Sequence, residues 1–194
     1  MIELIKKLRV ETGVSLALCK EALEESKGNI EKAKEILRKK GEEIVKKKSI
    51  RGATAGTIHF YIHPNTQIGV MLEIYCETDF VIKSEPFKTL SREICLQIAA
   101  TAPLLVSEED ITESFLSKER EIYQAQMAKL KKPVEIMEKI IDGKIEKYKR
   151  EVVLLSQQWI KDSSKTIKNL IDETITKTGE NIQIKRFTRY EVNN

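Results

Sequence analysis

Apolar residues recur at helical spacing through the first forty positions of the chain. They fall every three or four residues within the stretches 2–8, 16–23 and 30–37. Because an α-helix repeats every 3.6 residues, this spacing places the apolar side chains of each stretch on one face. The pattern therefore predicts three short amphipathic helices.

Small and polar residues between these stretches match the ends of helices. Thr12-Gly13 breaks the first helix, and Ser15 is a candidate N-cap of the second. Gly28 can adopt the left-handed conformation that closes the second helix, and Asn29 can cap the third. We expect Gly41 to end the third helix, since the apolar pattern stops before it.

The pattern changes to a period of two after residue 55. Pro64-Asn65-Thr66 provides a turn between two alternating runs. We predict an antiparallel hairpin with one apolar face packed against a helix over residues 87–101, and with His59 and His63 facing solvent. The apolar positions of the two runs are Ile58, Phe60, Ile62, Val70, Leu72, Ile74 and Cys76.

Helical spacing returns along the rest of the chain. The predicted helices cover residues 118–130, 134–141, 144–155 and 166–178, and residues 182–192 alternate like a terminal strand. Gly143 is expected to separate the second of these helices from the third. The sequence thus predicts an α+β fold with a three-helix module at residues 1–41, a charged linker at 42–54, and a core at 55–194 in which an antiparallel sheet packs against helices.

Positive charge is concentrated near the start of the chain. The 194 residues carry a formal net charge of +4, and residues 1–50 hold 13 basic and 9 acidic residues. A basic region can steer an acidic partner, which leaves open an RNA- or ribosome-associated binding module. It is equally typical of a solvated lysine-rich helix or linker. Aromatic residues make up only 6% of the chain and do not interleave with a basic stripe, which weakens the RNA-binding hypothesis.

Neither the cysteines nor the histidines form a recognisable motif. Cys19, Cys76 and Cys95 are scattered and odd in number, unlike a disulfide framework. His59, His63 and Cys76 could be imagined around a metal ion, but no CxxC or HxxxH spacing accompanies them. Histidines on the solvent side of a strand are the better interpretation, and we expect no metal site and no cofactor.

Motifs of enzymes, secretion and membrane insertion are also missing from the sequence. It contains no Gly-rich phosphate loop and no GxSxG motif, and it offers two histidines for acid–base chemistry. We expect no secretory signal, because residues 1–7 carry an acid and no cleavable apolar segment. No apolar run approaches the roughly 18–20 residues that a membrane span needs. We therefore expect a cytoplasmic binding protein that is neither an enzyme nor attached to a membrane.

One short segment combines a charge with a large aromatic side chain at the end of a predicted strand. Asp79 and Phe80 follow the alternating run that ends at Cys76, with Thr78 before them and Val81 after them. This pair can push into another protein. The alternative is that Phe80 is a core aromatic at the end of the sheet and that Asp79 is the first acid of a helix.

Several short motifs follow one another in a specific order along nearly the whole chain. They are Leu8-Arg9-Val10-Glu11-Thr12-Gly13, Cys19-Lys20-Glu21-Ala22-Leu23, Leu37-Arg38-Lys39-Lys40-Gly41, Glu73-Ile74-Tyr75-Cys76-Glu77-Thr78-Asp79-Phe80-Val81, Gln97-Ile98-Ala99-Ala100 with Pro103, Glu119-Arg120-Glu121-Ile122-Tyr123, and Gly179-Glu180-Asn181-Ile182 with Arg186-Phe187. In this order they resemble the motifs of the elongation factor Ts family. The chain departs from the family at Tyr75, where the family usually has Asn, and at Lys83, where it often has Arg. It also has Leu16-Ala17-Leu18 where the family tends to have Met-Met-Asp.

The resemblance implies a function and a set of contact residues. Residues 1–41 would form a ubiquitin-associated-like module, and the chain would promote GDP release from elongation factor Tu without needing nucleic acid. Asp79 and Phe80, set by Thr78 and Val81, would intrude on the magnesium and phosphate-loop site of that partner. A second contact would use Thr12, Gly13, Val14, Leu16, Ala17 and Lys20, with Lys48 and Arg51 near the linker.

The resemblance also bears on oligomeric state. Some long members of the family carry two related core halves, and this chain is too short for both. A homodimer could supply the second half, as in other short members. We therefore predict a homodimer.

Overall fold

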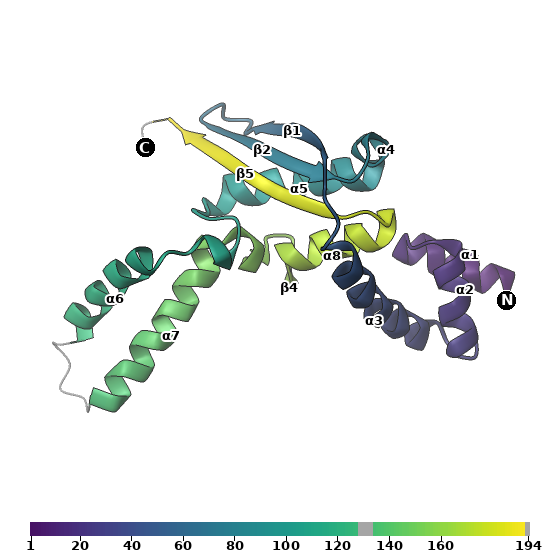
Figure 1. The fold of residues 1–194 in the computed structure, drawn as a ribbon, viewed down its shortest axis with the longest axis horizontal. Coiled ribbons are helices and arrows are strands. Elements are labelled where there is room, and N and C mark those ends of the chain that lie inside the picture. Colours follow the sequence, from purple (N-terminus) through teal and green to yellow (C-terminus); the bar gives the residue numbers. More distant parts are fainter. Residues whose placement is uncertain (128–133, 193–194) are drawn as a thin grey trace.

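Helices form both ends of the molecule, and a sheet lies between them (Figure 1). The computed structural model describes residues 1–127 and 134–192. It confirms the predicted α+β class. The elements are α1 (Ile2–Thr12), α2 (Leu16–Glu25), α3 (Ile30–Lys48), β1 (Ala55–Ile62), β2 (Ile68–Cys76), α4 (Asp79–Lys83), α5 (Glu85–Thr101), α6 (Glu113–Met127), α7 (Val134–Val152), β3 (Gln158–Trp159), β4 (Asp162–Thr166), α8 (Ile167–Thr178) and β5 (Ile182–Glu191).

The helix ends of the N-terminal region form where the sequence predicts them. Gly13 closes α1 with a left-handed φ of 70°. The Ser15 hydroxyl accepts a hydrogen bond from Leu18 N at 3.4 Å, and Asn29 Oδ1 accepts one from Lys32 N at 3.0 Å, so both residues cap helices as expected. The apolar faces of α1, α2 and α3 meet in a core of Leu8, Val14, Cys19, Ala22, Leu23, Ala33 and Leu37.

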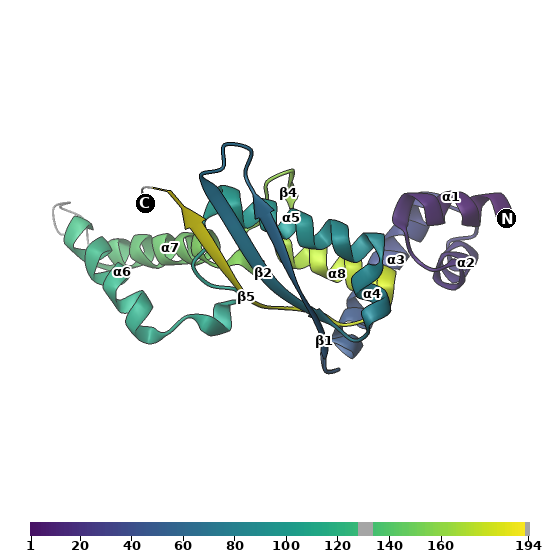
Figure 2. The same ribbon diagram turned by 90° about the horizontal axis from the view of Figure 1, so that it is seen from above.

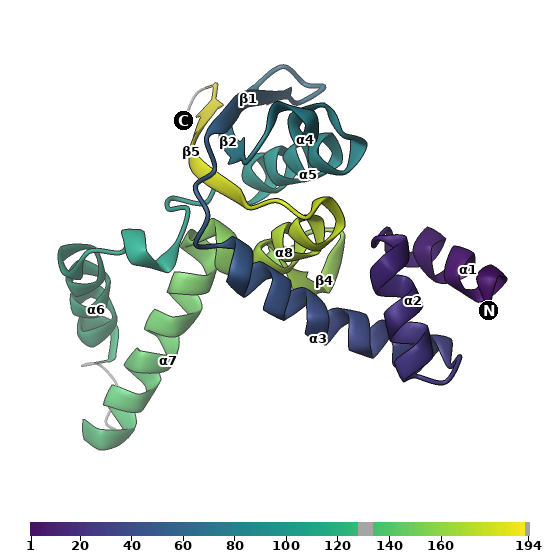
Figure 3. The ribbon, with the colours of Figure 1, turned by 45° about the vertical axis from the view of Figure 1, so that its right-hand side comes forward.

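The predicted end of the third helix at Gly41 is wrong. Helix α3 continues to Lys48 and runs from α1 and α2 to α8 (Figure 3). Gly41 is buried, and a Cβ at this position would lie 3.0 Å from Thr176 Oγ1 of α8. Glycine is a poor helix former, but here it lets two helices approach closely. Residues 42–48 of the predicted linker are therefore helical, and the division into residues 1–41, 42–54 and 55–194 stays a prediction.

This contact makes Gly41 a test of how closely α3 and α8 pack. A glycine-to-alanine change inside a helix normally stabilises a protein by about 0.5–1 kcal/mol. We expect that gain for Gly143→Ala in α7, because no described atom lies within 4 Å of a Cβ placed there. We expect Gly41→Ala to be less stable than Gly143→Ala by about 1 kcal/mol, since overpacking is destabilising. Urea unfolding of the two variants measures the difference.

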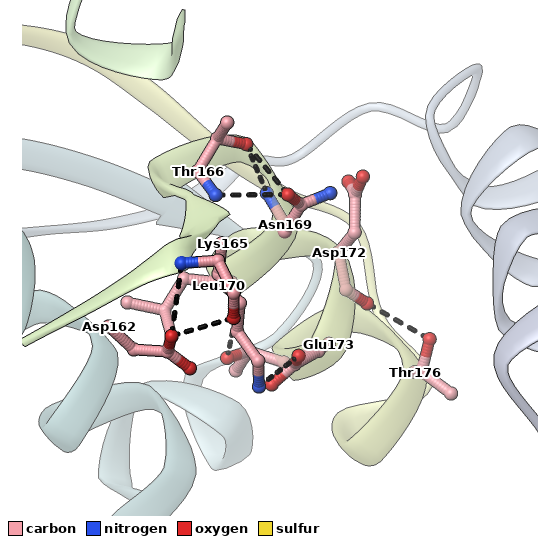
Figure 4. A network of polar contacts seen from close by, with 10 residues as sticks. Asp162, Lys165, Thr166, Asn169, Leu170, Asp172, Glu173 and Thr176 are labelled. Carbon is pink, nitrogen blue, oxygen red and sulfur yellow. Dashed lines mark hydrogen bonds and ion pairs between the residues drawn. The ribbon is translucent and has the colours of Figure 1, made fainter. Parts of the chain in front are cut away.

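A second variant shows whether the loss at Gly41 comes from Thr176. The Thr176 hydroxyl donates to the Asp172 carbonyl at 2.9 Å, which holds it in place against α3 (Figure 4). Thr176→Ala in the Gly41→Ala background removes the clash and should recover most of the lost stability. Equal stabilisation by the two single alanine changes would contradict the close approach.

Strands β1, β2 and β5 form an antiparallel sheet in the order β1-β2-β5. One face packs on α5, with α8 beneath it, so sheet and helices form layers (Figures 1 and 2). A register shift between Glu73 and Ile74 bends the β2–β5 pair. The buried side chains of this core include Val70, Leu72, Ile74, Cys76, Val81, Phe87, Leu90, Ile94, Ile98, Ile167, Ile171 and Ile182.

The apolar face of β1, which the alternation predicts to be buried, is in fact the side that faces outward. Strand β1 pairs with β2 so that Tyr61 lies opposite Val70 and His59 opposite Leu72. Because paired residues share a face, His59 and Tyr61 point toward the core and Ile58, Phe60 and Ile62 point outward. The expectation that His59 faces solvent is thus wrong. Burial and the charge of Arg92 lower the pKa of His59.

Helices α6 and α7 form a hairpin that projects from the end of the molecule opposite α1 and α2 (Figures 1 and 2). Its apolar contacts come from Leu116, Tyr123, Met127, Met137, Ile140, Ile141 and Ile145. Helix α7 passes through Gly143 without a break, so the predicted division there is wrong. The predicted helix end at residue 130 lies outside the described residues.

At the start of α8, polar side chains hold β4 and the helix together. Thr166 and Asn169 form a reciprocal capping box, and Lys165 pairs with Glu173 at 2.6 Å (Figure 4). These contacts fix the N-terminus of α8. Its C-terminus leads into the short segment that precedes β5. Among the described residues, no helix combines the length and apolar character that crossing a membrane requires.

Candidate functional site

The 78–81 segment turns the chain from strand into helix at one end of the sheet. Strand β2 ends at Cys76, and α4 begins at Asp79 with Thr78 in the N-cap position. Val81 is 9% exposed and packs into the main core, with Ile82 partly buried beside it. These two side chains anchor α4, and the short helix therefore presents Asp79 and Phe80 on its other side.

Phe80 is 79% exposed, so it is not a core aromatic at the sheet end. Large aromatic side chains are usually at least partly buried in soluble proteins, so an exposed one is available for contact with a partner. The geometry is that of an apolar side chain already oriented toward solvent. It can enter a partner's surface without rearrangement of the core beneath it.

Asp79 is both exposed and the first acid of α4. Lys83 lies one turn later and pairs with it at 2.9 Å between Nζ and Oδ2. The hydrogen bond from Lys83 lowers the pKa of Asp79, so the carboxylate is charged at neutral pH. Asp79 can therefore be the first acid of a helix and still be available to contact another protein.

Glu180, which follows α8, holds Thr78. Its carboxylate accepts from Thr78 N at 2.9 Å and from the Thr78 hydroxyl at 2.7 Å. The sequence analysis did not select Glu180 as a site residue. Its signal was the Gly179-Glu180-Asn181 motif, but that motif does not say which segment its carboxylate reaches.

Arg51 and Lys48 lie near the 78–81 segment rather than with the contact residues of α2. Arg51 pairs with Glu77 at 3.5 Å, and Glu77 Oε1 also accepts from Asn181 N at 2.8 Å. The Asn181 side chain in turn donates to the Arg51 carbonyl at 2.7 Å. The Asn181 hydrogen bond, with smaller effects of Lys48 and Arg51, lowers the pKa of Glu77.

The predicted contact residues of the N-terminal region divide into exposed and buried sets. Leu16, Ala17 and Lys20 are exposed on α2, and we call them the α2 surface. Thr12 is half-buried and donates to the Leu8 carbonyl, while Gly13 approaches the alkyl chain of Lys177. Val14 is 6% exposed inside the three-helix core, so its side chain is not available for a contact.

The α2 surface and the 78–81 segment lie toward the same end of the molecule, away from α6 and α7 (Figures 1 and 2). Helix α3 connects them by packing against α1 and α2 at one end and against α8 near the other.

Two lysines of α3 form ion pairs with acids of α1 and α2. Lys34 pairs with Glu11 at 2.9 Å, and Lys40 lies 3.4 Å from both Glu21 and Glu25. Phosphate binding depends on cations that are available to neutralise charge. These ion pairs therefore do not favour the RNA-binding alternative.

The three cysteines lie inside the fold, and one of them contacts the 78–81 segment. The three cysteines are buried, and burial raises the pKa of Cys95 to about 12, which makes its thiol inert. Cys76 Sγ donates to the Thr78 carbonyl at 3.0 Å. Within residues 1–127 and 134–192, no group of three or more His, Cys, Asp or Glu side chains is placed to hold a metal ion.

Comparison with known proteins identifies relatives over nearly the whole chain. A family model described as elongation factor TS matches residues 5–194. The chain is 51% identical over 191 residues to elongation factor Ts of Thermotoga neapolitana, covering 98% of this chain and 96% of the relative. It is 50% identical to the protein of the same name from Thermotoga petrophila, with 98% and 95% covered. The corresponding protein of Carboxydothermus hydrogenoformans is 47% identical, with 98% and 88% covered.

Proposed function

The chain belongs to the elongation factor Ts family, and from this premise we propose that it is the guanine nucleotide exchange factor of elongation factor Tu in the cytoplasm. The observation that carries the proposal is the exposed pair Asp79 and Phe80, held on a short helix whose other side is anchored in the core. The charge and the apolar side chain are presented together at one end of the sheet. That arrangement suits intrusion into a partner better than packing within this chain.

The proposed mechanism is displacement of the groups that hold the nucleotide phosphates. Magnesium and the phosphate loop of a GTPase bind these phosphates through contacts that depend on tight geometry. Phe80 wedges between elements of the partner's GTPase domain, and Asp79 displaces groups that position the magnesium and the phosphate loop. Small shifts of these elements weaken the binding of GDP.

Such a factor needs no active site of its own. Weakened GDP binding in the complex means equally weakened factor binding in the presence of GDP, because the coupling between two sites is reciprocal. Each tenfold loss of GDP affinity requires about 1.4 kcal/mol of coupling. One aromatic side chain buried at an interface supplies about 2 kcal/mol. Contact energy alone is therefore of the required size.

The α2 surface provides a second contact in this proposal. Leu16 is 48% exposed and lies beside Ala17 and Lys20, which gives an apolar patch with a positive edge. Docking there brings the 78–81 segment close to its target at high effective concentration. Thr12 and Gly13 support this surface from within the N-terminal helices. Arg51 and Lys48 place positive charge beside Glu77, next to the 78–81 segment.

We further propose that two copies of the chain pair through the outer face of the sheet. This outer face is formed by Ile58, Phe60, Ile62, Met71 and Tyr190, which are 49–71% exposed. A contiguous apolar patch on a strand surface marks an interaction site. Glu73 and Arg186 pair on the same face, so this charged pair would lie within the proposed interface.

A GDP-release assay tests the proposed function. Elongation factor Tu loaded with a fluorescent GDP analogue is mixed with excess unlabelled GDP and increasing concentrations of the chain. We expect release that accelerates with concentration and then saturates, together with co-purification of the two proteins. Unaccelerated release, accompanied by a salt-sensitive shift of RNA, would instead support the RNA-binding alternative.

A further inference from the structure

Helix α4 has little to hold it in one orientation. It contains five residues, and an isolated helix of that length is not stable in water. Val81 and the partly buried Ile82 anchor the C-terminal part of this helix, while Asp79 and Phe80 at its start are exposed. Anchors at one end leave the other end of a short helix free to pivot, so a fixed orientation of Asp79 and Phe80 needs an attachment at the N-terminus of α4.

Thr78 provides that attachment through Glu180. Both the backbone N–H and the hydroxyl of Thr78 donate to the same carboxylate, at 2.9 and 2.7 Å. In the described contacts, the hydroxyl is directed to Glu180 and not to the first N–H groups of α4, where an N-cap threonine usually bonds. Two charge-assisted hydrogen bonds to one group fix both the position and the rotation of Thr78.

Glu180 is itself held in place by the end of α8. Gly179 closes α8 in the left-handed conformation at φ 73° and donates to the Ile175 carbonyl, which sets the direction of the chain at Glu180. The next residue, Asn181, donates to Glu77, so each of the two segments supplies one carboxylate to the other. The carboxylates of Glu77 and Glu180 thus make reciprocal connections: Glu77 accepts from Asn181, and Glu180 accepts from Thr78. Together they tie the start of the 78–81 segment to the residues that follow α8.

We propose that Glu180 is a positioning residue for nucleotide exchange, which it serves by fixing Thr78 so that α4 presents Asp79 and Phe80 in one orientation. This inference rests on the proposed exchange function. Without the carboxylate, α4 samples several orientations, and only a fraction of docked complexes carries the pair in a productive one. The observed rate falls to that fraction of its original value.

The GDP-release assay separates positioning from docking. We expect Glu180→Ala to lower the saturating release rate about tenfold, while the half-saturating concentration changes by less than about threefold, because the α2 surface still docks. Glu180→Gln keeps one oxygen acceptor and should fall between Ala and the original chain. Glu121→Ala, at an exposed position on α6, is the matched control and should leave both parameters unchanged.

A double variant tests whether Glu180 acts through Thr78. Thr78→Val removes the hydroxyl that Glu180 binds. If the two residues act together, the loss of rate in the double variant is smaller than the product of the two single losses. Multiplicative losses would contradict an action through Thr78.

Limited proteolysis reports the orientation of α4 without elongation factor Tu. Chymotrypsin cleaves after exposed aromatic residues once the local chain can open, and Phe80 is such a residue. We expect Glu180→Ala to speed cleavage after Phe80 about tenfold, with cleavage after Phe115 in α6 unchanged as an internal reference. Mass spectrometry of the fragments identifies each site.

The two readouts distinguish failure of this inference from failure of the proposed function. If the original chain accelerates GDP release and Glu180→Ala does so with an unchanged saturating rate, the positioning role is wrong. If the original chain does not accelerate release at all, the exchange function is wrong. Independently of the release assay, unchanged cleavage after Phe80 in Glu180→Ala would exclude Glu180 as the group that orients α4.

Discussion

Replacing Phe80 with alanine is expected to lower the rate of GDP release from elongation factor Tu about 30-fold while the fold stays intact. Phe80 is 79% exposed, so its removal leaves no cavity, and alanine is a better helix former within α4. A central aromatic contact contributes about 2 kcal/mol to an interface, which corresponds to about 30-fold. Stopped-flow release of the fluorescent GDP analogue measures the change.

Two control variants define what this result means. Ile136→Ala removes an exposed apolar side chain from α7, where no contact with the partner is proposed, and should leave the rate unchanged. Phe87→Ala removes a side chain that is 2% exposed and should cost about 3–5 kcal/mol of stability, unlike Phe80→Ala. Phe80→Ala with an unchanged release rate would exclude the wedge role.

Local sequence signals predict local structure well in this chain. Ser15, Asn29 and Gly13 act at helix ends as expected, because capping depends on residues that are neighbours in sequence. The position of Asp79 and Phe80 just after β2 could likewise be predicted from the sequence, since the alternation stops there. The family resemblance then gave these residues a function that the pattern alone left open.

Features that depend on packing between distant segments were predicted wrongly or missed. Gly41 is typical of a helix end by propensity, yet contact with Thr176 of α8 makes it an interior residue of α3. Glu180 lies 102 positions from Thr78, and no local pattern connects the two. Such pairings emerge only when the chain has folded.

The orientation of β1 shows the same limit in a different form. Both strands of the hairpin alternate clearly, but the apolar positions of β1 and β2 lie on opposite faces of the sheet. Alternation fixes which residues share a face within one strand, whereas the turn fixes how two strands are paired. The turn at residues 63–67 sets Phe60 opposite Met71, so the apolar run of β1 joins the outer face.

Replacing Phe60 with aspartate is expected to convert the proposed homodimer into a monomer. Phe60 is 71% exposed and lies in the outer face between Ile58 and Ile62. A two-fold interface contains each substitution twice, so a loss of about 2 kcal/mol per side chain weakens association about 1000-fold. Burial of two unpaired carboxylates would weaken it further. Sedimentation equilibrium at micromolar concentration measures the masses of the original chain and the variant.

Ile2→Asp is the matched control for this substitution. Ile2 is 72% exposed, and it lies at the start of α1, where an acid is favoured by the helix dipole and no dimer contact is proposed. The Ile2→Asp variant should remain a dimer, while Phe60→Asp should be a monomer with an unchanged circular dichroism spectrum. Because Phe60 is already exposed in the single chain, the substitution should lower the stability of that chain by no more than about 1 kcal/mol, through the low strand propensity of aspartate. A monomeric original chain at micromolar concentration, or a Phe60→Asp variant that still dimerises, would exclude the outer face as the interface.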